Sequence, residues 1–329
     1  MTPLLKVENV VKRFAVGDRT LTALDGISLQ IEPGESVGLV GESGCGKSTL
    51  ARTIIGLEQA DGGSIQLQGQ ELVGLSHRGW LPHRRDVQMI FQDPFASLNP
   101  RLTIGRIIEE PLLVHRVGDA ASRRQRSAEL MARVGLKPEW RERFPHEFSG
   151  GQRQRIGIAR ALALSPRLLI CDEPVSALDV SVQAQVQNLL SDLREELGLA
   201  YLFISHDLAV VAHLCTRIFV MYLGQVVEIG DRRTLHAAPR HPYTQALVAA
   251  SPVPDPDRAA DFGNEVQGDI PSQLDLPPGC RFHPRCPRAT ERCRSEAPLL
   301  RQLDASTWAA CHYADVPAAN AGPRLREAA

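Results

Sequence analysis

The sequence predicts an α/β fold with a mixed sheet, an antiparallel β subdomain, a helical subdomain and a small C-terminal region that contains cysteines. Three observations lead to this prediction. Short alternating segments separated by turns open the chain, and apolar strand patterns then alternate with helical patterns up to residue 232. Between residues 93 and 164 the pattern is mostly helical. After residue 232 the chain becomes rich in Pro, Ala and Cys, which indicates a separate region.

The expected elements follow from apolar runs and the turn residues between them. Strands are expected at residues 4–10, 21–24, 27–31, 36–40, 64–68, 87–91, 168–171, 200–204, 217–221 and 225–229, and helices at residues 48–57 and 182–197. We therefore expect a core domain over residues 1–232, with its helical subdomain at about 93–164, and a C-terminal region over 233–318. Residues 319–329 are expected to be a disordered tail.

Composition narrows the function. The 329 residues carry a net charge of −1, which argues against a large nucleic-acid interface. No run of eighteen apolar residues is present, so no transmembrane helix is expected. The first residues lack a basic start followed by an apolar run, so we expect no signal peptide and a cytoplasmic protein. A role at a membrane would then require partners that span the bilayer.

A glycine-rich loop is the strongest chemical signal. Residues 41–48, GESGCGKS, follow an apolar strand pattern, precede a helical pattern and fit G-x4-G-K-[ST]. Glycines let the backbone N–H groups point at phosphate oxygens, while the lysine reaches the β- and γ-phosphates. The expected nucleotide contacts here are Gly41, Ser43, Gly44, Cys45, Gly46, Lys47, Ser48 and Thr49. The motif alone predicts binding of a nucleoside triphosphate, and the alternative is a glycine-rich turn that matches by chance.

Two carboxylates end a later apolar strand pattern, at Asp172 and Glu173. In phosphate-loop enzymes an aspartate in this position supports Mg²⁺ together with the loop hydroxyl, here Ser48. Glu173 then lies where it can orient the attacking water. An acidic pair at a strand end is common, so this pattern predicts a catalytic site only in combination with the other motifs.

The run Phe148-Ser149-Gly150-Gly151-Gln152 identifies the class. It resembles the signature of the ABC transporter ATPase family, usually written L-S-G-G-Q, with Phe in place of Leu. The resemblance implies an ABC ATPase core that hydrolyses ATP with Mg²⁺. It also implies that Ser149, Gly151 and Gln152 close on the γ-phosphate held by the phosphate loop of a second subunit, so that hydrolysis needs a dimer.

Other positions resemble further functional residues of that family, in order along the chain. Gln92 resembles the glutamine that senses Mg²⁺ and water, and His206 resembles the histidine that contacts the γ-phosphate. Residues 176–179, ending at Asp179, resemble the loop that crosses the dimer interface. Phe14 resembles the ring that stacks on adenine, with a core phenylalanine as the alternative. The implied catalytic residues are Glu173, His206 and Gln92, and the implied Mg²⁺ ligands are Ser48, Gln92 and Asp172.

Residues 91–101, FQDPFASLNPR, and 241–247, HPYTQAL, are more particular. Both resemble the peptide/nickel branch of the importers, which implies import of di- or oligopeptides. Residues 99–101 and 108–111 resemble the second ATPase subunit of dipeptide and oligopeptide systems. The implied partners are a homologous second ATPase, two transmembrane permease subunits and, indirectly, an extracytoplasmic binding protein. The implied location is the cytoplasmic face of the inner membrane.

Four cysteines crowd the C-terminal region, at Cys280, Cys286, Cys293 and Cys311. Their spacing fits neither a zinc ribbon nor a ferredoxin, and thiolates suit both zinc and iron–sulfur clusters. The family resemblance implies a structural [4Fe–4S] cluster. Zinc, with His283 or His312 as a ligand, and four unligated cysteines are the alternatives.

Rival functions belong to other classes. A GTPase or kinase is disfavoured because the N-K-x-D motif is absent from the sequence and a Ser-Gly-Gly-Gln run has no place in either. A soluble ABC protein acting on ribosomes or DNA would carry two ATPase units or a long coiled-coil insertion, and this sequence shows neither. Within transport, nickel, glutathione or an opine-like solute are the alternatives to peptides.

Overall fold

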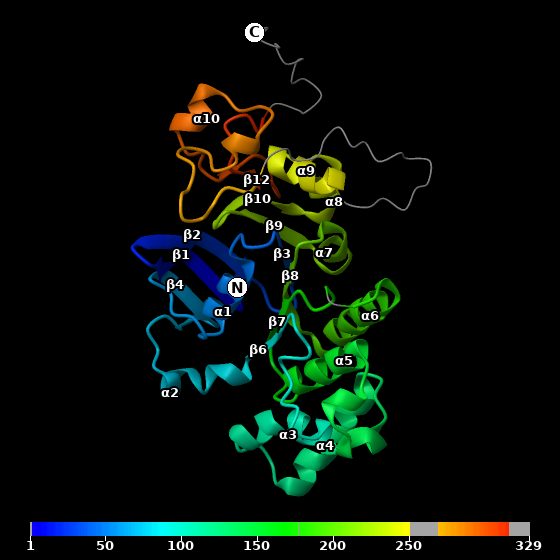
Figure 1. Cartoon of the computed structure of the whole chain (residues 1–329). Helices are drawn as coiled ribbons and strands as arrows, with labels where there is room; N and C mark the ends of the chain where they lie inside the picture. The colour runs from blue at the N-terminus through cyan, green and yellow to red at the C-terminus, as the bar shows by residue number, and fades with distance from the viewer. Residues whose placement is uncertain (1, 177, 251–268, 316–329) are drawn as a thin grey trace, which may run out of the picture.

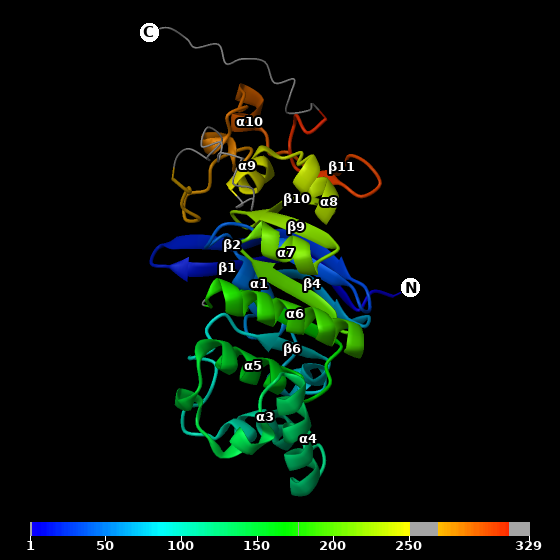
Figure 2. The same ribbon diagram turned by 90° about the vertical axis from the view of Figure 1, so that its right-hand side faces the viewer.

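The structure is a computed structural model that describes residues 2–176, 178–250 and 269–315. The molecule is elongated, with the C-terminal region at one end, helices α3 to α5 at the other and the two sheets between them (Figures 1 and 2). The predicted disordered tail at 319–329 lies outside the described residues.

Strands form two sheets that share the middle of the molecule. They are β1 Leu5–Val16, β2 Arg19–Ile31, β3 Ser36–Val40, β4 Gly62–Leu67, β5 Gln70–Glu71, β6 Val87–Ile90, β7 Leu168–Asp172, β8 Ala200–Ser205, β9 Arg217–Tyr222, β10 Gln225–Asp231, β11 Arg301–Gln302 and β12 Trp308–Ala309. The two strands expected at 21–24 and 27–31 are the single strand β2, because Gly26 takes a φ of 71° and lets the chain bend within the strand.

The helices cover the sheets and build the far end of the molecule. They are α1 Lys47–Ile54, α2 His77–Trp80, α3 Ile104–Val114, α4 Ala120–Arg133, α5 Gly150–Ala161, α6 Val180–Leu197, α7 Leu208–Leu214, α8 Arg232–Ala237, α9 Pro242–Ala250 and α10 Glu291–Ser295, with 3₁₀ turns η1 His83–Arg85, η2 Pro138–Glu142, η3 Pro145–Glu147 and η5 His283–Arg285.

Sheet topology confirms the predicted mixed fold. Within the described residues, four strands form an antiparallel sheet in the order β2-β1-β4-β5, and eight form a second sheet in the order β11-β12-β10-β9-β3-β8-β7-β6. In the larger sheet β6, β7, β8, β3 and β9 run parallel, while β10, β12 and β11 are each antiparallel to the strands beside them in the sheet order. The carboxyl ends of β3, β7 and β8 therefore meet at one edge, where ligands bind in open α/β sheets.

The C-terminal region is joined to the core through the sheet. Strand β12 pairs with β10, with Ala309 opposite Glu228 and Trp308 opposite Ile229. The boundary expected near residue 232 falls at the start of α8, and the chain later returns to extend the same sheet. The C-terminal region is thus continuous with the sheet that carries the phosphate loop.

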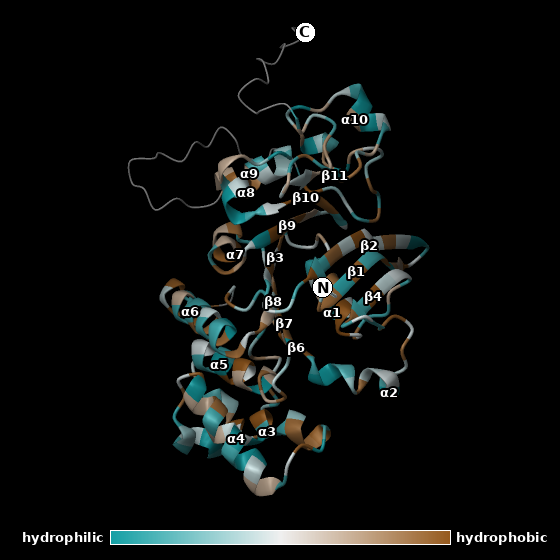
Figure 3. Cartoon of the chain, turned by 180° about the vertical axis from the view of Figure 1, so that it is seen from behind, coloured by the Kyte–Doolittle hydropathy of each residue, from teal (hydrophilic) through white to brown (hydrophobic). Residues whose placement is uncertain are grey.

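Hydrophobic residues follow the inner layers. Figure 3 shows them along β6 and β7 of the larger sheet, whereas α4 carries mostly hydrophilic residues. Each residue of β3 and of β7 is buried, as expected for parallel strands covered on both faces. Among the described residues no helix is long and apolar enough to cross a membrane.

Candidate functional site

The phosphate loop lies between buried β3 and the start of α1. Gly46 is the N-cap of α1 and supplies no side-chain cap, so the first N–H groups of the helix are left for a ligand. Glycine is required here because the φ of Gly46 is 109° and an added Cβ would lie 2.4 Å from the Ala23 carbonyl oxygen. The loop therefore has the open, amide-lined form that binds phosphate.

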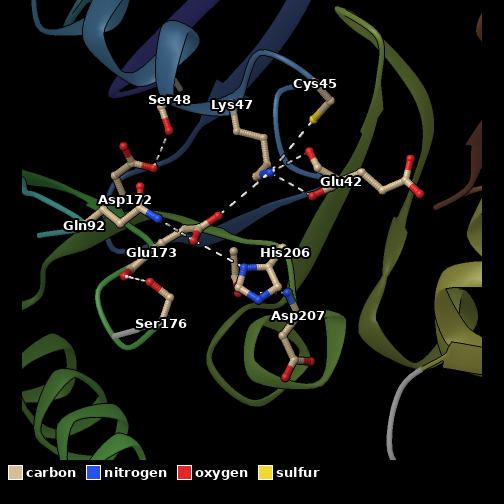
Figure 4. Close-up of polar contacts among 12 residues, drawn as sticks. Glu42, Cys45, Lys47, Ser48, Gln92, Asp172, Glu173, Ser176, His206 and Asp207 are labelled. Atoms are coloured by element: carbon tan, nitrogen blue, oxygen red, sulfur yellow. Dashed lines mark hydrogen bonds and ion pairs between the residues drawn. The ribbon is translucent and has the colours of Figure 1, made fainter. Parts of the chain in front are cut away.

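Lys47 lies inside this loop and is nearly buried, with 4% of its surface exposed. Its Nζ donates to the carbonyl oxygens of Gly41, at 2.7 Å, and of Glu42, at 3.0 Å. It also lies 4.0 Å from Glu173 Oε1 (Figure 4). The ammonium group thus rests between the loop and the carboxylate that faces it.

Glu173 gathers the polar groups of the site around one carboxylate. It follows β7 directly, its φ is 45°, and its N–H donates to the Ile204 carbonyl at 2.9 Å, which fixes it against β8. Its Oε2 accepts from Gln92 Nε2 at 3.0 Å and lies 3.2 Å from His206 Nδ1. A left-handed backbone at a non-glycine residue is strained, and such strain concentrates at functional sites.

Ser48 and Asp172 lie next to this cluster. The Ser48 hydroxyl donates to Asp172 Oδ1 at 3.0 Å (Figure 4). Burial raises the pKa of Asp172, which shows that the carboxylate lies in a desolvated place where a cation would be a favourable neighbour. A hydroxyl and a carboxylate oxygen are the hard donors that Mg²⁺ prefers, so these residues fit the ion that accompanies ATP.

An open cavity of about 650 Å³ adjoins the cluster. Its walls include Glu42 and Ser43 of the phosphate loop, and Gln92, Glu173 and His206 opposite them. A second cavity, of about 690 Å³, lies on the other side of Gln92, between the core and α3. The structure thus brings the three predicted catalytic side chains together at the phosphate loop. The loop and the three side chains come from four separate segments of the chain.

The signature residues lie elsewhere. Ser149 caps α5, accepting from Gln152 N–H at 3.3 Å, while Gln152 Oε1 accepts from Ser149 N–H at 3.0 Å. Ser149 is exposed, and among the described residues it is not part of the wall of either cavity. Gly151 is buried, and a Cβ there would come 2.4 Å from the Val182 side chain. Asp179, at the start of α6, is exposed.

Phe14 and Thr49 are two more predicted nucleotide contacts, and both are half-buried. Phe14 is half-buried on β1, and Lys12 Nζ lies 5.0 Å above its ring centre. Thr49 is half-buried in α1, where its carbonyl accepts from Thr53. Both side chains are thus partly exposed.

Cys45 is the cysteine of the phosphate loop, so its reactivity has to be considered. Only 3% of its surface is exposed, and burial raises the pKa of its thiol. A protonated, buried thiol is a poor nucleophile. Cys45 therefore acts as a small packing side chain of the loop.

The predicted iron–sulfur site, and with it metal binding by these cysteines, is wrong. Among the described residues no group of three or more His, Cys, Asp or Glu side chains is arranged to hold a metal ion. The four cysteines border one very small apolar cavity. Burial there raises the pKa of Cys280 to about 11 and of Cys286 to about 12, as expected for thiols beside an apolar cavity. They fill space as small apolar side chains.

Residues of the C-terminal region also contact the phosphate loop, and no sequence signal predicts these contacts. Arg285, Tyr243 and Gln273, all from the C-terminal region, hydrogen-bond to loop residues. Tyr243 belongs to the run 241–247 that resembles the peptide/nickel branch, but no local pattern indicates what Tyr243 or Arg285 touches. Only the tertiary structure brings them to the loop.

Comparison with known proteins places the chain in a family. Residues 24–176 match the family described as ABC transporter, and residues 227–293 match the family described as oligopeptide/dipeptide transporter, C-terminal region. The chain is 50% identical to the di/tripeptide transport ATP-binding protein DppF of Pseudomonas aeruginosa (strain UCBPP-PA14), over 96% of this chain and 99% of that protein. It is 51% identical to the oligopeptide transport ATP-binding protein OppF of Escherichia coli (strain K12), over 90% of this chain and 92% of that protein.

A solved structure agrees with the fold. The ATP-binding cassette MJ0796, dimeric and bound to ADP and Pi in a post-hydrolysis state, is 32% identical and superposes with a TM-score of 0.65, over 70% of this chain and 99% of that one. The part left over is the size of the C-terminal region. The chain therefore belongs to the ABC transporter family, as an ATP-hydrolysing subunit that carries the oligopeptide/dipeptide transporter C-terminal region.

Proposed function

We propose that this ATPase powers the import of di- or oligopeptides through permease subunits in the membrane. The observation that carries the proposal is the near full-length similarity to proteins named for di/tripeptide and oligopeptide transport, C-terminal region included. The geometry supports the ATPase chemistry, because the carboxylate of Glu173 faces an amide-lined phosphate loop across an open cavity.

Hydrolysis would use the residues around Glu173 in distinct ways. When ATP binds, Lys47 Nζ exchanges its loop carbonyl partners for the β- and γ-phosphates. Glu173 Oε2 accepts a hydrogen bond from the attacking water and orients it towards the γ-phosphorus, while Gln92 and His206 hold that carboxylate and complete the site. Mg²⁺, held by Ser48, Asp172 and Gln92, would neutralise charge on the phosphate oxygens.

A second ATPase subunit would complete each site. Ser149 lies at the exposed start of α5 and does not line the cavity beside its own phosphate loop, which supports a contact with the nucleotide of another chain. Asp179 would cross the same interface. The partner would be a homologous ATPase, and closure of the pair on two ATP molecules would drive the permease outward-facing until hydrolysis resets it.

The remaining partners would lie in the membrane. The cavity between the core and α3 is lined by Phe91, Gln92 and Asp93, and it would receive a permease segment, so that the γ-phosphate is sensed through Gln92. The protein would therefore work at the cytoplasmic face of the inner membrane, with an extracytoplasmic binding protein delivering peptide to the permease.

Reconstitution tests this function. The ATPase, its homologous partner, the two permease subunits and the binding protein are placed in proteoliposomes, and ATP hydrolysis is measured with and without peptides of two to five residues. We expect stimulation by binding protein and peptide together, and transport of labelled peptide. Equal stimulation by nickel or glutathione in place of peptide would contradict the substrate class, while a lack of hydrolysis under every condition would contradict the site.

A further inference from the structure

The C-terminal region reaches back onto the phosphate loop. Residues 242–250 and 269–315 follow the whole ATPase core in sequence, yet three of their side chains hydrogen-bond to loop residues 42–44. This contact joins the part of the chain that matches the C-terminal transporter family to the part that holds phosphate.

Glu42 is held at both its side chain and its backbone. Arg285 Nη1 and Nη2 donate to its two carboxylate oxygens at 2.8 and 2.9 Å, a bidentate ion pair in which only 5% of the arginine side chain is exposed. The Glu42 N–H donates to Tyr243 Oη at 2.8 Å. These contacts therefore restrict the conformation of Glu42, the second residue of the phosphate loop.

Two more contacts extend the support along the loop. Gln273 Nε2 donates to the Gly44 carbonyl at 2.6 Å. Arg281 donates to the Leu223 carbonyl and to Asp25, and the next residue of that hairpin, Gly224, donates its N–H to the Cys45 carbonyl at 2.9 Å. The C-terminal region therefore touches the loop directly at residues 42 and 44 and indirectly at residue 45.

The support itself is rigid. Tyr243 is fully buried and packs against Tyr222 and Phe282, with ring centres 4.7 and 5.5 Å away. The backbone N–H of Tyr243 donates to His241 Nδ1 at 3.0 Å, and the N–H of His241 donates to buried Glu228 at 2.8 Å. A hydrogen bond from a packed, hydrogen-bonded side chain loses little entropy when it forms.

These contacts act on the part of the loop that handles phosphate. The Glu42 carbonyl accepts from Lys47 Nζ, and Glu42 and Ser43 form the cavity wall opposite Glu173. Leu247 of α9 lines the same cavity. Because Gly41, Gly44 and Gly46 all take positive φ, the isolated loop would sample many conformations.

We infer that the C-terminal region positions the phosphate loop for ATP, with Arg285 as the main positioning residue and Tyr243 as the second. In this role the region stabilises the loop conformation that binds ATP relative to the other conformations of the loop. When only a fraction of the molecules carry the ready loop, the apparent dissociation constant rises in inverse proportion to that fraction. Loss of the support would therefore weaken ATP binding and leave the chemical step nearly unchanged.

The experiment measures ATP affinity, steady-state kinetics and backbone hydrogen exchange on the full chain with its partner subunits. For Arg285→Met we expect KM and the dissociation constant for ATP to rise about tenfold, with kcat within about twofold. Amide exchange in peptides covering residues 41–49 should speed up without nucleotide. Arg292→Met is the matched control, because Arg292 forms a similar bidentate ion pair with Glu296 on the exposed side of the same region, and it should change nothing.

Two further variants keep the inference open to refutation. Tyr243→Phe removes only the acceptor of the Glu42 N–H and keeps the packing, and should raise the dissociation constant about threefold. Glu42→Gln combined with Arg285→Met should be no worse than Arg285→Met alone, because both act on one contact. The inference is overturned if folded Arg285→Met, or Tyr243→Phe where Arg285→Met does not fold, binds ATP and exchanges its loop amides like the wild type.

Discussion

Helices α1 and α5 both begin where the family resemblance places phosphate, yet their N-termini are built in opposite ways. At α1 the N-cap is Gly46, which satisfies none of the first N–H groups with a side chain. At α5, Ser149 and Gln152 form a reciprocal capping box. A glycine N-cap costs a helix only roughly a few tenths of a kcal/mol relative to a capping serine, so the open end of α1 gives up little stability and leaves donors for a ligand.

The two ends also differ in what surrounds them. The start of α1 is enclosed by Lys47, by the carboxylate of Glu173 and by the C-terminal region, whereas the start of α5 is exposed. An enclosed, uncapped end needs outside support to keep one shape. A capped, exposed end is stable alone, and its serine can still donate its hydroxyl hydrogen to a phosphate from another chain. The comparison predicts separate roles, binding at α1 and closure at α5.

The largest expected effect removes chemistry from the α1 side while leaving both helix ends intact. Glu173→Gln keeps the size of the side chain and one acceptor oxygen, but it lacks the charge that orients water. We expect kcat to fall by at least about 100-fold, with ATP still bound. Because both ends can still hold ATP, the subunits should stay closed as an ATP-loaded dimer in size-exclusion chromatography. Hydrolysis at the wild-type rate would refute the role of Glu173.

A second substitution breaks the α1 end itself. Lys47→Ala removes the ammonium group that lies 2.7 Å from the Gly41 carbonyl and would reach the phosphates. We expect the dissociation constant for ATP to rise by about 30-fold or more, since a buried charge contact with phosphate is lost. Fluorescence titration with a labelled nucleotide measures it. An unchanged affinity would mean that the loop does not bind phosphate through Lys47.

The α5 end should respond differently. Ser149→Ala should slow ATP hydrolysis of the assembled complex about tenfold and leave ATP affinity of the isolated chain unchanged, because the serine acts on the partner's nucleotide. Loss of the cap also destabilises the helix by about 1 kcal/mol. Ser76→Ala, which removes the N-cap of α2 where Ser76 accepts from Gly79 N–H, is the control for that cost. Weaker ATP binding by the isolated Ser149 variant would place the serine in its own chain's site.

The same contrast explains what could be predicted from sequence. The loop, the strand before it and the Asp172-Glu173 pair were predicted because strand, turn and helix signals are local and the carboxyl ends of parallel strands share an edge. The clustering of Gln92 and His206 at Glu173 followed from the family resemblance. The pair Arg285–Glu42 was not foreseen, because its partners lie 243 residues apart and neither carries a local signal.

The cysteine prediction shows another limit. Spacing and clustering suggested a metal, but they report nothing about how much water reaches a thiol. In the fold the thiol of Cys286 is desolvated, and that burial raises its pKa to about 12. Burial and the relative placement of side chains are properties of the packed region, so neither could be obtained from the sequence.

The smallest expected effect concerns the support of the α1 loop and its response to pH. His241 is fully buried, and burial lowers the pKa of its imidazole from 6.5 to about 3. Between those values the unfolded chain binds a proton that the folded chain does not, so stability falls as the pH drops below 6.5. We expect a loss of about 1 kcal/mol between about pH 7 and about pH 5.5, measured by urea unfolding. Burial raises the pKa of neighbouring Glu228, whose protonation acts on stability in the opposite sense, so the wild type is compared with a variant that shares Glu228.

A matched variant isolates this contribution. His241→Asn keeps an acceptor for the Tyr243 N–H at the start of α9 but has no proton to gain in this range. The free energy of unfolding of this variant should change little between the same two pH values, except for the contributions of titrating groups that the wild type also has. The protection of loop amides 41–49, corrected for the intrinsic pH dependence of exchange, should fall with pH in the wild type and be flat in the variant, because His241 anchors Tyr243, which holds the loop. Identical pH profiles for both proteins would show that His241 titrates normally in the fold.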